Sequence, residues 1–189
     1  MGYTQAKGGM ENYNLLGREN EYAWMPVVHY ETKKGIYAEL RYNYEEAQTF
    51  SVFGGKVLSG NNGSFRVTPM IGFSAGKFTG ISFATNADAE FNKFFLSTET
   101  QYSMAAKKDG NNFLFSWSEI GYSIFPNLFA GLSFQYTIQQ GIADPEPGLM
   151  AGISFKNFSI PVYVFNPFGK EQYLVFGLNY EYHLKRSNK

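Results

Sequence analysis

The sequence predicts an all-β fold, an up-and-down antiparallel β-barrel of twelve strands that spans a membrane, and three observations predict it. Apolar and polar residues alternate with a period of two along most of the 189 residues, as in a strand with one apolar and one polar face. The alternating segments are long enough to cross a bilayer as tilted strands, which takes roughly 9–11 residues, whereas strands of soluble proteins usually have about five or six. Aromatic residues make up 19% of the chain, and many lie near segment ends, where membrane–water interfaces favour them.

The alternation is clearest in segments 128–139 and 173–184. In the first, one face carries Leu128, Ala130, Leu132, Phe134, Tyr136 and Ile138, and in the second one face carries Leu174, Phe176, Leu178, Tyr180, Tyr182 and Leu184. The other predicted strands are 10–18, 20–31, 36–45, 48–58, 64–75, 81–90, 94–104, 113–124, 148–156 and 157–165. Segment 113–124 is ambiguous because its apolar residues share a face with Glu119, so we expect a β-bulge there.

The connections set the number of strands. Tight turns are predicted at 32–35, 60–63, 92–93, 125–127 and 156–157, and the connections between them are 45–48, 76–80, 106–112, 140–147 and 166–171. Bacterial membrane barrels have short periplasmic turns, long outer loops and both chain ends in the periplasm. This pattern requires a strand before residue 20, so 10–18 is predicted to close the barrel against 173–184. Within 140–147, Asp144-Pro145-Glu146-Pro147 is interpreted as a rigid turn.

One domain is expected in this chain. Residues 1–9 are predicted to be a disordered N-terminal segment, 10–184 a single transmembrane β-barrel, and 185–189 a polar C-terminal tail. The N-terminal residues lack the apolar stretch of a signal peptide, so we expect that an export signal was removed. No run of apolar residues reaches the length of a transmembrane helix.

The whole pattern resembles that of small bacterial outer-membrane β-barrel proteins. The final strand, with Phe176, Tyr180 and Tyr182, resembles the C-terminal signal read by the barrel assembly machinery, although Leu184 and a polar tail replace its usual terminal aromatic residue. The resemblance implies a bacterial outer-membrane location, with membrane lipid and the assembly machinery as partners. Small twelve-stranded members of this class include oligosaccharide channels, a phospholipase and a lipid A deacylase, and no motif selects one of them.

The composition excludes several classes of function. The formal net charge is zero, which is not the basic footprint of a protein that binds nucleic acid. The absence of Cys excludes disulfide scaffolds and thiolate zinc sites. His29 and His183 are the only histidines, so we expect no metal and no cofactor.

Alternation alone does not tell a membrane barrel from a soluble lipid-binding barrel, in which the apolar face points inward. Segment length, aromatic density and the scarcity of Lys on the polar faces favour the membrane interpretation. The outer face should then carry an aromatic girdle at the two lipid surfaces. Its candidates are Tyr22, Tyr30, Tyr42, Tyr44, Tyr136, Tyr180 and Tyr182.

The polar faces would then line a lumen that leans acidic. Its candidate lining residues are Glu39, Arg41, Asn43, Glu45, Arg66, Asp88, Glu99, Gln101, Gln135, Asn179 and Glu181. Carboxylates favour a narrow pore that passes small cations or solutes, but Glu39, Arg41, Arg66 and Glu99 could equally form a hydrogen-bonded plug in a structural or anchor barrel. A lipid-modifying enzyme is the alternative from another class. No catalytic residue is predicted, because neither histidine has an adjacent serine or a hydrolase motif.

Overall fold

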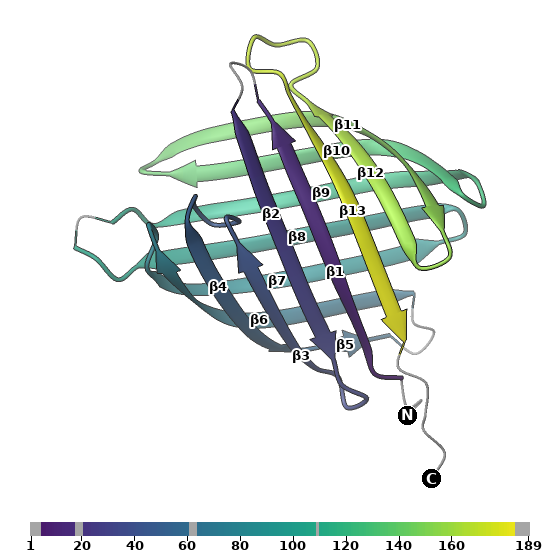
Figure 1. Cartoon of the computed structure of the whole chain (residues 1–189), viewed down its shortest axis with the longest axis horizontal. Helices are drawn as coiled ribbons and strands as arrows, with labels where there is room; N and C mark the ends of the chain where they lie inside the picture. Colours follow the sequence, from purple (N-terminus) through teal and green to yellow (C-terminus); the bar gives the residue numbers. More distant parts are fainter. Residues whose placement is uncertain (1–4, 18–20, 61–63, 109, 184–189) are drawn as a thin grey trace.

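The computed structural model describes residues 5–17, 21–60, 64–108 and 110–183 and is built from antiparallel strands (Figure 1). The strands are β1 (Lys7–Leu16), β2 (Tyr22–Glu31), β3 (Ile36–Tyr42), β4 (Thr49–Lys56), β5 (Leu58–Ser59), β6 (Phe65–Gly76), β7 (Gly80–Phe91), β8 (Phe94–Ala105), β9 (Phe113–Phe125), β10 (Leu128–Gln139), β11 (Ile142–Phe155), β12 (Phe158–Phe165) and β13 (Tyr173–His183). None of these described segments is a helix long and apolar enough to cross a membrane.

The sheet closes into a barrel of twelve strands, as predicted. β1 pairs with both β2 and β13, from Lys7↔His183 to Leu16↔Leu174, so the first and last strands meet. β4 and β5 both pair with β6 in one continuous register, Gly55↔Met70 and then Leu58↔Val67, so together they form a single barrel strand. β1 begins at Lys7, three residues before the predicted start of the barrel, and the predicted tail 185–189 lies outside the described residues.

The barrel has two walls whose strands cross at a steep angle (Figure 1). β2, β1, β13 and β12 form the front wall in that view, and β6 to β10 pass behind them. The start of β1 and the end of β13 lie at one end of the barrel, which we call the terminal end. The connections 43–48 and 166–172 lie at the opposite end, which we call the loop end.

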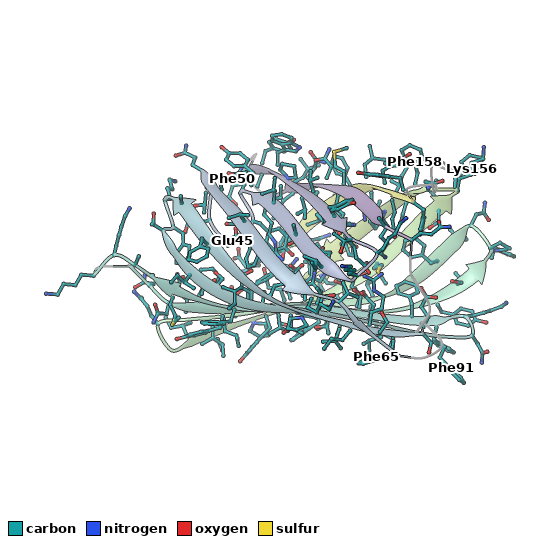
Figure 2. The ribbon with its side chains drawn as sticks, turned by 90° about the horizontal axis from the view of Figure 1, so that it is seen from below. Glu45, Phe50, Phe65, Phe91, Lys156 and Phe158 are labelled. Atoms are coloured by element: carbon teal, nitrogen blue, oxygen red, sulfur yellow. The ribbon has the colours of Figure 1, made fainter. Side chains whose placement is uncertain are left out.

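The outer surface is apolar. Figure 2 shows Phe50, Phe65, Phe91 and Phe158 pointing away from the barrel interior, and each is at least 48% exposed. Buried positions instead include charged and hydroxyl residues such as Arg41. A water-soluble lipid-binding barrel would have the reverse distribution, so that alternative is wrong, and this distribution is the one a barrel surrounded by hydrocarbon requires.

Six of the seven predicted girdle tyrosines lie on the outer face: Tyr22, Tyr30, Tyr42, Tyr136, Tyr180 and Tyr182. Tyr44 does not, and its assignment was wrong. β3 ends at Tyr42, and Asn43 adopts a positive φ of 57°, a left-handed conformation that Asn tolerates. This residue interrupts the alternation, and the Tyr44 hydroxyl instead donates to Glu99 inside the barrel (2.6 Å).

The connection predicted at 140–147 is also wrong, because β11 already begins at Ile142 and pairs with β10 through a turn at 140–141. β12 reaches β11 only as far as Gly148, and one further bond follows at Pro147, so 142–146 has a free edge. The Asn166 amide donates to the Pro147 carbonyl (2.7 Å), so the backbone groups of Pro147 face the β12 side of the strand. Those of Pro145, two residues earlier, face the same side, where the edge is free. Proline has no N–H, so it is tolerated there and leaves this side of the strand without two donors.

Replacing Pro145 and Pro147 together with Thr should allow this edge to pair with another strand, because it restores an N–H donor on the free edge at residue 145 and one beside it at residue 147. We expect the double variant to form dimers or larger oligomers in detergent, measured by size-exclusion chromatography with light scattering. Pro167→Thr, in the β12–β13 connection, is the control and should behave like the unmodified protein. An unchanged oligomeric state of the double variant would contradict this account of the prolines.

Candidate functional site

The barrel interior contains a cavity near each end. The larger, of about 990 Å³, lies at the loop end beside the β12–β13 connection, and the smaller, of about 580 Å³, lies toward the terminal end. We call them the loop-end cavity and the terminal-end cavity. No residue lines both of them in the described part of the chain. Two groups of buried side chains lie in the interior between the walls, and together we call them the septum.

The first half of the septum is a charged network around Arg41 of β3. This side chain is 1% exposed and forms ion pairs with Glu39, Glu45 and Glu99. Its Nη1 also donates to the Gln101 Oε1 (3.1 Å). β3 and β8 are separated by β4, β6 and β7 around the barrel, so the contacts of Arg41 with Glu99 and Gln101 bridge the lumen from one wall to another.

Aromatic rings and hydroxyls complete this network. The Arg41 guanidinium lies 4.6 Å from the Tyr44 ring centroid and 4.4 Å from that of Phe53, within the range of cation–π attraction. Gln101 Nε2 donates to the Ser103 hydroxyl (2.8 Å), which is paired with that of Ser82 (2.8 Å). The buried charge is therefore held by fixed partners on several strands, the condition under which burying a charge is tolerated.

The second half of the septum is an aromatic cluster around Trp117 of β9. The Trp117 ring centroid lies 5.3 Å from that of Tyr13, 5.1 Å from Tyr163 and 5.8 Å from Phe165. Its indole N–H donates to the Ser133 hydroxyl (2.8 Å), so the polar atom is satisfied. Met150 and Val175 complete the buried cluster, which lies in the part of the lumen enclosed by β9 to β13 and β1.

Inward-facing glycines let several aromatic rings lie flat against the wall. A Cβ built on Gly121 would lie 2.1 Å from Phe95 Cζ, and one on Gly152 would lie 2.3 Å from Phe129 Cζ. A ring that covers a cross-strand glycine stabilises the strand pair and keeps its bulk out of the lumen. The glycines of these strands therefore preserve the space of the terminal-end cavity, which Phe95 and Phe129 both line.

Gly121→Ala should push the Phe95 ring away from the wall and toward the lumen. We expect the free energy of unfolding to fall by about 1–3 kcal/mol, the usual cost of overpacking, as measured by urea titration in lipid vesicles. Gly54→Ala is the matched control, because a Cβ at Gly54 meets nothing within 4 Å. Equal stability of the two variants would show that Phe95 is not held by Gly121.

The terminal-end cavity is strongly acidic. Its lining carboxylates are Glu11, Asp88, Glu90, Glu99, Glu119 and Glu181, against Lys7 and Arg66 as permanent cations. At the rim, Lys7 contacts Glu181 (3.0 Å) and Glu31 (3.9 Å), and Arg66 contacts Glu31 (2.8 Å). Both cations are therefore engaged at the rim, and in the described part of the chain neither forms an ion pair with another carboxylate of the cavity.

The carboxylates without a Lys or Arg partner in the described part of the chain are Glu11, Asp88, Glu90 and Glu119. Glu11 accepts a hydrogen bond from Tyr13 (2.9 Å) and lies 3.6 Å from the His29 Nδ1. Asp88 accepts one from Ser97 (3.0 Å). Such uncompensated carboxylates give the lumen a negative potential that attracts cations.

The loop-end cavity is also acidic. Asp144 and Glu146 of the β10–β11 hairpin line it together with Glu21 and Glu171, and Lys170 is its only lining cation among the described residues. Tyr173 donates to Gln135 (3.2 Å) at its floor. Negative charge therefore lies on both sides of the septum.

Most predicted lumen residues point inward. Glu39, Arg41, Glu45, Glu99 and Gln101 belong to the septum network, Arg66, Asp88, Asn179 and Glu181 line the terminal-end cavity, and Gln135 lines the loop-end cavity. Asn43 does not line the lumen. Its side chain donates to the Trp24 carbonyl (3.0 Å) and accepts from the Gln48 amide (2.6 Å), so it stabilises the β3–β4 turn.

The predicted plug of four residues is only partly formed as expected, because Arg66 pairs with Glu31 at the rim and not with the septum. The aromatic half of the septum was missed entirely. Its signal was the ambiguous segment 113–124, where Phe113, Phe115 and Trp117 all face inward with Glu119. The register irregularity in β9 falls at its far end, opposite Leu128 and Phe129, and does not reverse these side chains.

His29 lies inside the barrel and His183 at the terminal end of β13. The His29 ring stacks on Tyr37 with 5.9 Å between centroids, near Glu11. The terminal-end cavity that His29 lines also contains Ser97, Ser123, Ser154 and Ser159, but no hydrogen bond joins any of them to His29 among the described residues. In the described part of the chain, none of these serine hydroxyls is therefore hydrogen-bonded to the imidazole.

Comparison with known proteins supports the fold. No protein-family model matches the chain, and no curated protein matches it. Among solved structures, the KdgM porin superposes with a TM-score of 0.66 at 12% identity, covering 93% of this chain and 99% of that one. A KdgM porin in complex with disordered oligogalacturonate gives 0.69 at 12% over 93% and 99%, and a NanC porin structure gives 0.65 at 8% over 93% and 100%. At these identities the likeness establishes the closed twelve-stranded barrel.

Proposed function

We propose that this protein is an outer-membrane β-barrel that forms a narrow, acid-lined pore for small cations. The observation that carries the proposal is the set of lumen carboxylates that have no Lys or Arg partner among the described residues, namely Glu11, Asp88, Glu90 and Glu119. Fixed negative charge along a confined path lowers the energy of a passing cation and raises that of an anion. The apolar outer face and the porin-like fold support placement in a bacterial outer membrane, with the terminal end in the periplasm.

The septum determines how narrow this pore is. It joins the two walls through Arg41 and narrows the remaining section with the Trp117 cluster. A barrel of this size lies between side-chain-filled small barrels and open porins. We therefore infer a low conductance for hydrated monovalent ions and no passage for an oligosaccharide. One KdgM structure contains oligogalacturonate, a polyanion that this acidic lumen would repel.

The test is single-channel recording in a planar bilayer under a KCl gradient. We expect small discrete steps and a reversal potential that indicates K⁺ preference over Cl⁻. Replacing Asp88 and Glu119 with Asn and Gln should shift the reversal potential toward zero without altering folding. Anion preference would overturn the proposal, and a complete absence of current would indicate a structural barrel.

A further inference from the structure

We propose that the terminal-end cavity is a binding site for a linear polyammonium ion, a chain of methylene groups that carries several amines. The inference deepens the proposed function, because it assigns an organic ligand to the same acidic lumen. It starts from the positions of the carboxylates. Glu11 is on β1, Asp88 and Glu90 are on β7, and Glu119 is on β9.

These carboxylates come from opposite walls of the barrel. β1 belongs to the front wall of Figure 1, whereas β7 and β9 belong to the rear wall. They also differ in depth, because Glu90 lies next to the β7–β8 turn whereas Glu119 lies two residues from Trp117 of the septum. Negative charges distributed in this way match a ligand whose positive charges are separated along a chain.

The aromatic residues that line the cavity match the methylene groups of such a ligand. Phe95 and Phe129, folded against Gly121 and Gly152, offer apolar surface for methylene groups, and aromatic faces attract ammonium ions. The ring centroids of Phe95 and Phe129 lie 5.7 Å apart. A cavity of about 580 Å³ is within the usual range for sites that hold a small organic molecule.

Unsatisfied polar atoms point to a ligand that donates hydrogen bonds. The Oδ1 atoms of Asn86 and Asn179 and the Nδ1 atom of His29 are buried without a partner among the described residues, and all three side chains line this cavity. Amide oxygens are acceptors, and an ammonium group carries only donors. The fourth such atom in the cavity is the Arg66 Nε, whose guanidinium is already paired with Glu31 at the rim. The two amide oxygens, which can only accept, therefore outnumber the one unsatisfied atom that can only donate.

The experiment measures binding of spermine to the whole protein in detergent by isothermal titration calorimetry. The test variant combines Asp88→Asn with Glu119→Gln in the terminal-end cavity. The matched control combines Asp144→Asn with Glu146→Gln, which removes the same two residue types from the loop-end cavity. Heat-dependent gel migration verifies that both variants are folded.

We expect the test variant to bind spermine at least tenfold more weakly and the control to keep its affinity. We also expect the affinity to fall as KCl increases, because salt screens these charges. A neutral chain of similar length, triethylene glycol, should not bind. Equal spermine affinity in the two variants, or equal binding of the neutral chain, would overturn the inference.

Planar-bilayer recording separates this inference from the proposed function. Spermine added at the terminal end should block the K⁺ current in the unmodified protein, and the block should weaken in the test variant. A cation-selective current with no spermine binding would leave the proposed pore standing and reject the site. Spermine binding that depends on Asp88 and Glu119, without any current, would support the site and reject the proposed pore.

Discussion

Arg41→Met is expected to cause the largest loss of stability of any single substitution in the lumen. The substitution keeps an unbranched apolar stem, although a shorter one, and leaves Glu39, Glu45 and Glu99 without their shared cation. The side chains of these acids are 4%, 0% and 22% exposed. Removing one partner of a buried charge network costs about 3–5 kcal/mol, because the remaining charge is left desolvated. Equilibrium urea unfolding in lipid vesicles measures this change.

A compensated variant tests the reason for that loss. Arg41→Met combined with Glu39→Gln, Glu45→Gln and Glu99→Gln removes the carboxylate charges together with the guanidinium. Replacing a whole buried ion cluster with neutral groups is often close to neutral in free energy, so we expect most of the lost stability to return. If the fourfold variant is no more stable than Arg41→Met, the loss comes from packing against Tyr44 and Phe53 rather than from unpaired charge.

The period-two pattern predicted the barrel because one physical rule holds along almost every strand, with lipid on one side and the lumen on the other. It failed where the backbone left the extended region. Asn43 has a φ of 57°, and Tyr44 consequently points to Glu99 rather than to lipid. Nothing in the residue order of 42–45 requires that conformation, since Asn also occurs within regular strands.

The rule also could not identify the aromatic half of the septum. Aromatic residues occur both on the lipid face and in a packed lumen. The sequence alone therefore did not show that Trp117 and Phe115 point inward. The prolines of β11 present a similar problem. Pro145 and Pro147 indicate a turn unless the free edge of the strand is known, and that edge depends on where β12 ends.

The pairing of Arg41 with Glu99 depends on the whole closed sheet. The two residues are far apart in the chain, and their strands are not neighbours. The sequence showed that both belong to polar faces but not which acids Arg41 would meet. Register and closure together determine that Arg66 reaches Glu31 at the rim while Arg41 reaches across the lumen.

Trp117→Ala is expected to open the pore more than any other single substitution. Trp117 is 7% exposed and contacts the rings of Tyr13, Tyr163 and Phe165, so its removal leaves a void in the part of the septum that Arg41 does not bridge. We expect single-channel conductance to rise severalfold while K⁺ preference persists, because the lumen carboxylates are unchanged. The free energy of unfolding should fall by about 3–5 kcal/mol, the usual cost of truncating a buried Trp to Ala.

Trp24→Ala is the matched control, because Trp24 is the other tryptophan of the chain and lies on the outer face, 45% exposed. Its indole donates to Asn12 (2.5 Å) on the same face, away from the lumen. The control should therefore leave conductance unchanged. If Trp117→Ala folds normally and conducts like this control, the aromatic cluster does not limit the pore, and the Arg41 bridge alone would have to account for its narrowness.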